Sequence, residues 1–568
     1  MAVGPTSWVG HPRIKGSNEV MQMALLTTAG IGLSFCWGTE MTYATPYLLS
    51  LGLSKTGLSL VWVAGPLSGL VMQPIIGMIS DKSTSQFGRR RPFMLAGALA
   101  VVVCMMVLGW TKELVAWFVQ DVEGRRRISI WVAVVDIYVL DFVINISQST
   151  CRALVVDALP VEKQQLGSAW ASRMGGLGNM LVYAIGALDL NALFGNFLGD
   201  TQFKKVCAIA AFAMIVAQGT TCWAVTERVL VADVSKDVSK GESLFSVLKQ
   251  IYMTTLNLPD RIRAICMVQF WSWIGWFPFL FYGSTWVGEI YLRNQAPTSE
   301  SDALTDVGRI GSVAYIVFAI ISFAASIVLP WLVRSPEDDE SPRYTPRPPE
   351  GLGSMLANMK VAKPTLLTTW MLANVMFFTA MIFAPFVRSA GFATVVIALC
   401  GIPWAIAGWA PGTFLGVEVN KMSSTIPLAN GLRGAYRRPS NGSIELESRV
   451  SSHSSQSSSH SSQHSSPRTL HLRHDSNASS ANNASTGELS GIYLGILNIY
   501  TTLPQFVGTG ISWVVFSILE PGKSPELAKE AHPDEHHSTE GVSGIAVCLF
   551  IGAISAMGAA WATRKLKT

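Results

Sequence analysis

Long apolar stretches recur along the whole chain, separated by polar segments. A transmembrane helix needs about 20 mostly apolar residues, and twelve stretches of the sequence reach this length. They lie near residues 22–50, 57–79, 93–111, 129–156, 167–190, 204–224, 263–287, 309–333, 365–387, 392–416, 489–519 and 542–562. The pattern predicts an all-α membrane protein with twelve transmembrane helices.

The polar segments divide these helices into two sets of six. We expect an N-terminal six-helix lobe at 1–224, a central cytoplasmic loop at 225–262 and a C-terminal six-helix lobe at 263–568. Two such sets joined by a central loop are the plan of a two-lobed transporter. Within the second lobe, residues 417–488 include "SSHSSQSSSHSSQHSS" (451–466), which is too poor in apolar side chains to form a core. We expect a disordered cytoplasmic insert there.

The basic residues of the loops predict how the chain crosses the membrane. Lysine and arginine are enriched in cytoplasmic loops, and both "DKSTSQFGRRRP" (81–92) and the tail "RKLK" (564–567) are basic. We therefore place these segments inside and the acidic loop 519–541 outside. The stretch "GRRR" (124–127) opposes this orientation, which the remaining loops favour.

The composition argues against several classes of protein. Only 14% of the residues are charged, against about 25% in soluble proteins. The net charge of +5 is spread over loops, which disfavours nucleic-acid binding. The eight cysteines lie in or beside apolar stretches without a Cys-x-x-Cys pair, so we expect neither disulfides nor a metal site. No Ser/His/Asp arrangement or phosphate-binding loop lies at membrane depth, so we do not expect an enzyme.

One predicted span carries a polar stripe. In "VLDFVINISQSTCRALVVD" (139–157), steps of 4, 3 and 4 bring four polar side chains to nearly one helical face, namely Asp141, Asn145, Gln148 and Arg152. Ionisable groups at membrane depth are costly and usually face a cavity or a partner. The stripe predicts either a path for a polar substrate or a structural polar network between helices.

The two charged residues of this stripe lie at different depths. Counted from about Ser129, Asp141 lies roughly 18 Å into the membrane, near its midplane. Arg152 lies about 16 Å further along the helix, so the two side chains cannot form one direct ion pair. Asp141 suits a site that takes up and releases a proton, because burial favours the neutral form of a carboxyl group. Arg152 suits a gate or a sugar contact near the cytoplasmic end.

A second acidic residue lies in the first predicted span. Glu40 and Tyr43 are three residues apart in "SFCWGTEMTYATPY" (34–47). A carboxylate can bind sugar hydroxyls while an aromatic ring stacks on the apolar faces of the sugar. The alternative is a hydrogen bond that packs two helices.

The second lobe offers three further candidates for a cavity lining. Trp276 lies near Pro278, which can interrupt its helix and free backbone groups towards a cavity. The alternative for this side chain is the membrane interface, where Trp is common. Asn498 and Gln505 lie seven residues apart on one face of their helix, and Pro504 suggests a break there.

The stretch "GPLSGLVMQPIIGMISDKSTSQFGRRRPF" (65–93) resembles the sucrose-transporter branch of the major facilitator superfamily, the glycoside–pentoside–hexuronide cation symporters. Its core is similar to the loop 2–3 motif of that superfamily. An acid beside a basic cluster in such a loop can make ion pairs between helices that hold one gating state. The resemblance implies the major facilitator fold and gating roles for Asp81, Lys82, Arg89, Arg90 and Arg91.

The resemblance extends over most of the twelve spans and assigns roles to the polar stripe. It implies that Asp141 is the proton-coupling residue and that Arg152 is needed for sugar transport. Glu40 stands where plant members carry Gln, and "GSTWVGE" (283–289) stands in place of their acidic element. In both respects the chain looks like a fungal-type member.

These features predict a secondary active transporter that imports a disaccharide (sucrose, maltose or a related α-glucoside) with a proton, by alternating access. We expect no cofactor other than the coupling proton, and a monomer in the plasma membrane or alternatively the vacuolar membrane. A sugar sensor with little transport and a facilitative sugar uniporter are the alternatives. The predicted substrate-binding residues are Glu40, Tyr43, Asn145, Gln148, Arg152, Trp276, Asn498 and Gln505.

Overall fold

The computed structural model describes residues 7–81, 83–160, 163–232, 258–294, 303–334, 363–435, 476–525, 527–528, 533–536 and 541–567. The helices of the first half are α1 (Glu19–Thr27), α2 (Ala29–Thr39), the π-helix η1 (Glu40–Ala44), α3 (Thr45–Ser50), α4 (Lys55–Val61), α5 (Ala64–Asp81), α6 (Arg91–Gly109), α7 (Thr111–Phe118), α8 (Val122–Ala158), α9 (Gln164–Ala187), α10 (Leu190–Phe194) and α11 (Gln202–Ala224).

The second half is helical as well. Its elements are α13 (Asp260–Asn294), α14 (Ala303–Leu332), α16 (Leu366–Met381), η4 (Ala384–Phe386), α17 (Ala390–Leu399), α18 (Gly401–Ala435), α19 (Ser476–Leu519), η5 (Pro533–Glu535), α20 (Gly544–Thr563) and η6 (Arg564–Lys567). The prediction of a helical membrane protein is confirmed, because the described residues contain 11 helical segments long and apolar enough to cross a membrane. The remaining predicted span, 167–190, coincides with α9, whose glycine, serine, glutamine, arginine and asparagine residues make it less apolar.

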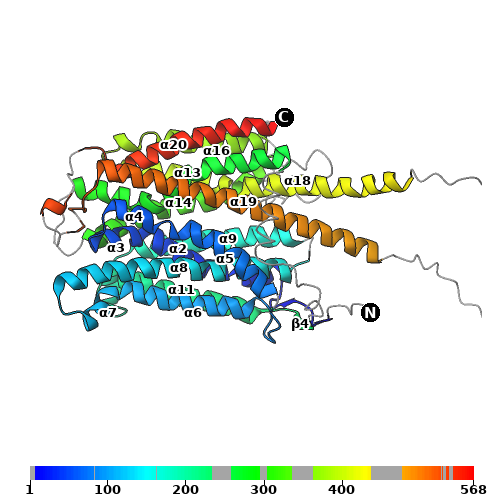
Figure 1. Ribbon diagram of the computed structural model, residues 1–568, viewed down its shortest axis with the longest axis horizontal. Helices are drawn as coiled ribbons and strands as arrows, with labels where there is room; N and C mark the ends of the chain where they lie inside the picture. The colour runs from blue at the N-terminus through cyan, green and yellow to red at the C-terminus, as the bar shows by residue number, and fades with distance from the viewer. Residues whose placement is uncertain are drawn as a thin grey trace, which may run out of the picture. The chain divides into compact units, whose positions relative to one another are not determined.

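Helices of the same half pack closely against one another. In the first half, α2 packs on α9 and α11, and α8 packs on α5 and α6. In the second half, α13 packs on α14 and α20, and α16 also packs on α20. Figure 1 shows α6, α8 and α11 near one another, and α13, α16 and α20 together elsewhere. Contacts between α9 and α14 join the two halves.

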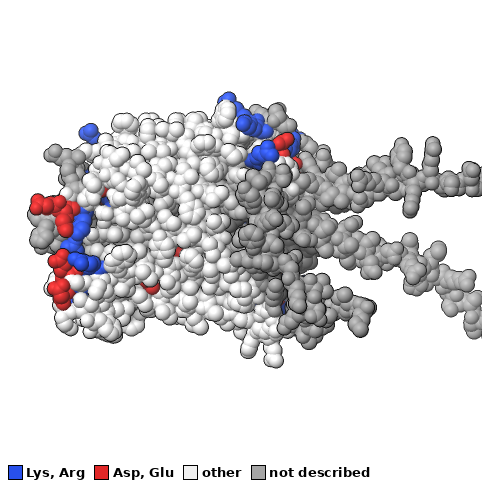
Figure 2. Space-filling view, viewed as in Figure 1, with Lys and Arg blue, Asp and Glu red and all other residues white. Residues whose placement is uncertain are grey.

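Charged side chains concentrate at the ends of the helices. On the face in Figure 2, Lys, Arg, Asp and Glu gather mostly near the two ends, and the surface between them is nearly uncharged. Large apolar side chains such as Trp131, Phe212 and Ile554 are exposed on the helices. An apolar band between charged ends suits a lipid bilayer. Following the predicted orientation, we call the end with the loop between α19 and α20 the outer end, and the end with Arg152 and Asp157 the inner end.

Two short antiparallel sheets, which the sequence did not indicate, join the N-terminal segment to the residues after α11. Strand β1 (Ser7–Val9) pairs with β4 (Val229–Ala232), and β2 (Arg13–Ile14) pairs with β3 (Val225–Thr226). The beginning of the predicted central loop is therefore extended backbone tied to the N-terminal segment. This contact links residues more than two hundred positions apart, which explains why local sequence patterns do not reveal it.

The predicted insert at 417–488 differs from expectation at both ends. Helix α18 continues to Ala435, and α19 begins at Ser476. Residues 417–435 still contain apolar residues and precede the serine- and histidine-rich sequence, so helical hydrogen bonding continues into them. Residues 436–475 lie outside the described part of the chain. The described residues within 415–494 are grouped as a unit of their own.

Candidate functional site

The polar stripe of α8 runs from a sealed position to an accessible one. Asp141 is 0% exposed and Asn145 is also buried, whereas Gln148 is half-buried and Arg152 is exposed. Because these side chains lie on nearly one helical face, the exposed fraction of the side chains rises along that face towards the inner end. The face is buried at Asp141 and exposed at Arg152.

The carboxyl group of Asp141 has no hydrogen-bond partner among the described residues, although both oxygens are buried. The side chain of Asn145 donates to the backbone oxygen of Asp141 at 2.9 Å and not to its carboxyl group. On the facing helix α5 stands Gly65, where an added Cβ would lie 4.0 Å from Asp141 Oδ2 and 3.8 Å from the Phe281 ring. A buried polar group without a partner is unusual in folded proteins and often has a functional role.

Glu40 is a second buried carboxyl group in the same region. It begins the π-helix η1, it is 1% exposed, and neither of its oxygens has a hydrogen-bond partner within the described residues. Its carboxyl group interacts electrostatically with that of Asp141. Short π-helical turns inside α-helices occur frequently at functional sites. The structure therefore brings together two predicted site residues that lie 101 positions apart in the sequence.

A chain of amide hydrogen bonds crosses from the first half of the protein to the second. Gln73 Nε2 on α5 donates to Asn145 Oδ1 at 3.3 Å, and Asn498 Nδ2 on α19 donates to Gln73 Oε1 at 3.1 Å. Asn145 Nδ2 also donates to Ser68 Oγ at 3.0 Å. Gln73 and Asn498 are half-buried. Gln73 was not among the predicted site residues, although a glutamine before Pro74 within an apolar stretch is a visible signal.

Three other predicted site residues have different surroundings. Tyr43 is fully buried, and its hydroxyl donates to the Gly186 oxygen on α9 at 2.6 Å. Gln505 is half-buried and donates to the Thr501 oxygen of its own helix at 3.1 Å. Trp276 is 2% exposed. It packs in an aromatic cluster of the second half, with ring centroids between 4.4 and 5.3 Å away in Phe279, Phe377 and Trp404. In this conformation Tyr43 and Trp276 do not face an accessible path.

At the inner end, the predicted gating arginines form ion pairs with α8. Arg89 lies 2.5 Å and Arg90 2.8 Å from the Asp157 carboxylate. Arg90 also donates to Ser80 on α5. This cluster fastens the loop before α6 to the inner ends of α5 and α8. The side chain of Asp81 and the whole of Lys82 lie outside the residues that the structure describes.

Glu227, which sequence analysis missed, completes this inner cluster. Its carboxylate accepts hydrogen bonds from the backbone N–H groups of Arg89, Arg90 and Arg91 at 3.0, 2.9 and 3.0 Å, and lies 3.6 Å from Arg91 Nε. A carboxylate at this position stabilises the N-terminus of α6, where backbone N–H groups lack helical partners. The residue follows β3, so it ties the segment after α11 to the arginine loop.

Contacts between the halves close the outer end beyond Asp141 and Glu40. Thr45 Oγ1 donates to the Phe281 oxygen at 2.9 Å, and Ser284 Oγ donates to the Met41 oxygen at 2.8 Å. An added Cβ on Gly308 of α14 would lie 2.1 Å from the Tyr43 ring. Such an approach is possible only for glycine. The structure is therefore sealed on the outer side of the two carboxyl groups.

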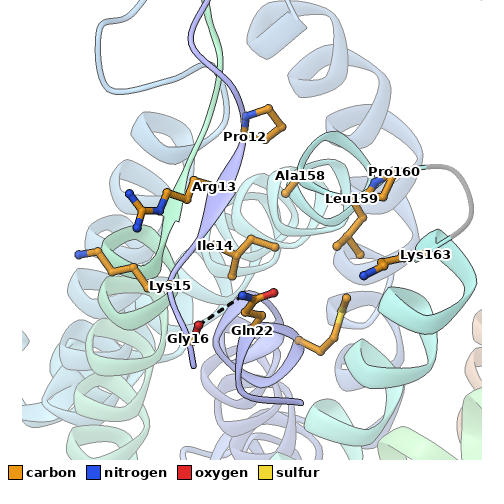
Figure 3. A pocket seen from close by; sticks show the side chains of 11 residues that line it. Pro12, Arg13, Ile14, Lys15, Gly16, Gln22, Ala158, Leu159, Pro160 and Lys163 are labelled. Atoms are coloured by element: carbon orange, nitrogen blue, oxygen red, sulfur yellow. Dashed lines mark hydrogen bonds between the residues drawn. The ribbon is translucent and has the colours of Figure 1, made fainter. Parts of the chain in front are cut away.

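A cavity of about 390 Å³ lies elsewhere, between β2, the start of α1 and the end of α8. Figure 3 shows Ile14, Gln22, Leu159 and Lys163 around it, with Arg13 and Lys15 directed away from Leu159. Lys163 pairs with Glu19 at 2.7 Å. None of the predicted substrate-binding residues lines this cavity. Within the described ranges, no group of three His, Cys, Asp or Glu residues is placed to hold a metal ion.

Comparison with known proteins places the sequence among transporters. Residues 27–158 match the family described as "MFS/sugar transport protein". The chain is 30% identical to the general alpha-glucoside permease of Schizosaccharomyces pombe, over 72% of this chain and 82% of that protein. It is also 30% identical to the sucrose transport protein SUC4 of Arabidopsis thaliana, over 55% of this chain and 62% of that protein.

Two solved structures share the fold. A variant of the nucleoside transporter NupG matches with a TM-score of 0.51 at 11% identity, covering 96% of this chain and 100% of that one. A bacterial homologue of the human lysosomal transporter Spinster, in an inward-facing and unoccupied conformation, also matches with a TM-score of 0.51, at 12% identity, covering 97% and 98%. At these identities the likeness shows the fold alone.

Proposed function

The chain belongs to the sugar-transport family of the major facilitator superfamily, and from that premise we propose that it imports a disaccharide together with a proton. It is a multi-pass membrane transporter of sugar and not an enzyme. The coupling ion, the direction of transport and the identity of the sugar are the parts that we propose. The observation that carries the proposal is the buried carboxyl group of Asp141, which has no hydrogen-bond partner among the described residues.

The proposed substrate is an α-glucoside such as sucrose or maltose. Similar proteins are named for alpha-glucosides and for sucrose. The amide chain of Asn145, Gln73 and Asn498 offers both donors and acceptors, which is what sugar hydroxyl groups require. Arg152 and Gln148 lie further along the same face of α8, where an incoming or departing sugar would pass. We infer that the sugar binds between the two halves, beside this amide chain.

The proposed proton site consists of Asp141 with Glu40 beside it. Two neighbouring carboxylates without a cation strongly disfavour each other when both are ionised. In the closed environment of these residues, an ionised pair would also lack water. We infer that at least one proton resides on the pair in this conformation, with Asp141 as the coupling residue. Glu40 either shares this proton or binds a sugar hydroxyl when the outer end is open.

The proposed cycle uses the two ends alternately. Asp141 takes up a proton from outside, sugar binds between the halves, and the halves then rock about the site so that the inner end opens. Asp141 releases its proton inward after the sugar has left. The ion pairs of Arg89 and Arg90 with Asp157 are formed while the outer end is closed, and their proposed gating role is to hold the inner end of the first half together, with Arg91 beside them. All proposed groups belong to one chain, so a monomer is the proposed working form. The plasma membrane is its proposed location.

The test is uptake of labelled sugars into vesicles that contain the purified protein. The panel holds sucrose, maltose and glucose, and each is measured with an imposed inward proton gradient and again after a protonophore has dissipated it. We expect accumulation of at least one α-glucoside disaccharide that disappears with the gradient. Uptake at the same rate with and without the proton gradient would show a uniporter. Absence of uptake for the whole panel would favour a sugar sensor.

A further inference from the structure

Lys55, the first residue of α4, is a fully buried lysine at the outer end. Its side chain is 1% exposed, and its Nζ atom lies 2.5 Å from Glu289 Oε1 and 2.6 Å from Glu520 Oε2. Both glutamate side chains are only 4% exposed. None of these three residues was among the predicted site residues. They form a buried group of three charges, which we call the outer triad.

The outer triad connects the two halves of the protein. Lys55 belongs to the first half, whereas Glu289 lies near the end of α13 and Glu520 directly follows α19. Glu520 Oε1 also accepts a hydrogen bond from the backbone N–H of Gly544 at 2.8 Å, at the start of α20. One lysine of the first half is thus attached to the outer ends of three helices of the second half.

The outer triad lies at the same end of the protein as the other contacts that close the outer side of Asp141 and Glu40. The hydrogen bonds from Thr45 to Phe281 and from Ser284 to Met41 also join the halves at this end. The Arg309 and Asp189 side chains form a further contact between α14 and the segment before α10, at 3.3 Å. Any motion that opens a path from outside to Asp141 by separating the halves here must pull Lys55 away from both glutamates.

We propose that the outer triad is the latch of the outer gate, and that Lys55 holds the outer end closed while the inner end is accessible. This proposal rests on the proposed alternating-access cycle. A buried ion group becomes strongly unfavourable when one partner is removed, because an uncompensated buried charge remains. Two glutamates without Lys55 would repel each other in the seal and would be stabilised by water, which is available only in the outward-open state. Loss of Lys55 therefore shifts the protein towards that state.

The test measures how fast the seal becomes accessible from outside. Ser284 is completely buried between the halves, so a cysteine placed there by S284C reports opening of the outer end. Cells that express the protein are treated with a membrane-impermeant maleimide, in the absence of sugar and of an imposed proton gradient. The protein with serine at position 284 gives the background from the native cysteines. Since neither sugar nor a gradient is present, the result does not depend on the proposed coupling.

We expect Lys55→Met to raise the labelling rate of S284C at least about tenfold, because removing one partner of a buried ion pair shifts equilibria by more than that factor. The matched control is Lys205→Met. Lys205 is also fully buried, and its Nζ atom lies 2.6 Å from Asn191, a partner in the same half. Labelling of Lys55→Met no faster than that of Lys205→Met would overturn the proposal.

Charge exchange separates the latch from a general role in folding. The triple variant K55E/E289K/E520Q exchanges the two charges that join the halves and neutralises the third, so one ion pair remains in the seal and slow labelling is expected to return. Rapid labelling of a well-folded K55E/E289K/E520Q protein would show that the ion pairs do not hold the gate. If Lys55→Met does not yield folded protein, E289Q/E520Q replaces it, since that variant leaves Lys55 buried without a carboxylate partner. The expected labelling is again fast, and slow labelling contradicts the latch.

Discussion

Asp141 and Arg152 lie on nearly one face of α8, yet Asp141 is completely buried and Arg152 is exposed. Eleven residues of helix separate them by about 16 Å. Neither side chain has a hydrogen-bond or ion-pair partner among the described residues. In a membrane transporter this arrangement places a carboxyl group at a buried position and a guanidinium group at the exposed end of the same helical face. Each group is then available to a ligand, and the following experiments separate their roles.

Arg152 should matter for sugar binding and not for stability. Hydrogen bonds to a charged group contribute about 1.5–3 kcal/mol, so Arg152→Gln should raise the KM for sugar roughly tenfold or more. Because no ion pair in the described structure would be broken, the melting temperature of the purified protein should stay unchanged. A clear fall in melting temperature, with the KM unaltered, would show that Arg152 is structural.

Gln73 should contribute to affinity through the amide chain. Replacing it with leucine removes the acceptor of Asn498 and the donor to Asn145. Leaving such groups unsatisfied costs about 1–3 kcal/mol, so we expect about a tenfold rise in the KM of Gln73→Leu. Gln218→Leu is the control, because Gln218 carries the same amide group and is fully buried, but among the described residues its side chain hydrogen-bonds only with Cys151 and Met214. Equal effects of the two substitutions on the KM would refute this role for Gln73.

Gly308 should be required for the outer end to close. A Cβ at this position would lie 2.1 Å from the ring of Tyr43, so Gly308→Ala must push α14 away from η1. Overpacking of this kind costs about 1–3 kcal/mol. We expect a lower melting temperature and slower uptake. Gly219→Ala is the matched control, since nothing lies within 4 Å of the added Cβ and alanine favours a helix by about 0.5–1 kcal/mol. Normal uptake by Gly308→Ala would argue against close packing at this contact.

The acidic loop at the outer end should not set the pH response of uptake. A hydrogen bond from Lys523 lowers the pKa of Glu535, and Arg126 adds a weaker effect. Because the pKa of Glu535 is lowered, its interaction with Lys523 is fully present above the ordinary glutamate pKa of about 4.3. The interaction is lost only as the pH falls through the lowered pKa. Between pH 5 and 8 Glu535 stays ionised. The profile of uptake against pH should therefore be the same in Glu535→Gln and the parent protein. A displaced profile would mean that this loop takes part in coupling.

The parts of the site that sequence analysis predicted depend on local periodicity. The stripe from Asp141 to Arg152 is visible in the sequence because four polar residues repeat at helical spacing within one apolar stretch. The contrast between helical spans and polar loops likewise predicts the fold class. Hydropathy and helical period are properties of neighbouring residues, so a single sequence displays them directly.

The missed residues act through partners that are distant in the sequence. Gln73 bonds Asn145, 72 positions away, and Asn498, 425 positions away. Glu227 accepts from the Arg89 backbone across 138 positions. Lys55 meets its two glutamates only because α4, α13 and α19 converge at one end. Trp276 is a predicted site residue whose surroundings also depend on distant partners. It was predicted to line a cavity, and in this conformation it packs among aromatic rings. Long-range packing decides which face of a uniformly apolar helix is buried.

Proton coupling through Asp141 is tested most directly by Asp141→Asn in vesicles. Labelled sugar is followed in two modes with the same preparation, accumulation driven by an inward proton gradient and exchange against unlabelled sugar at equal concentration. We expect Asp141→Asn to lose accumulation completely, because asparagine cannot carry the proton, while exchange continues. If Asp141→Asn still concentrates sugar against its gradient, Asp141 is not the coupling residue.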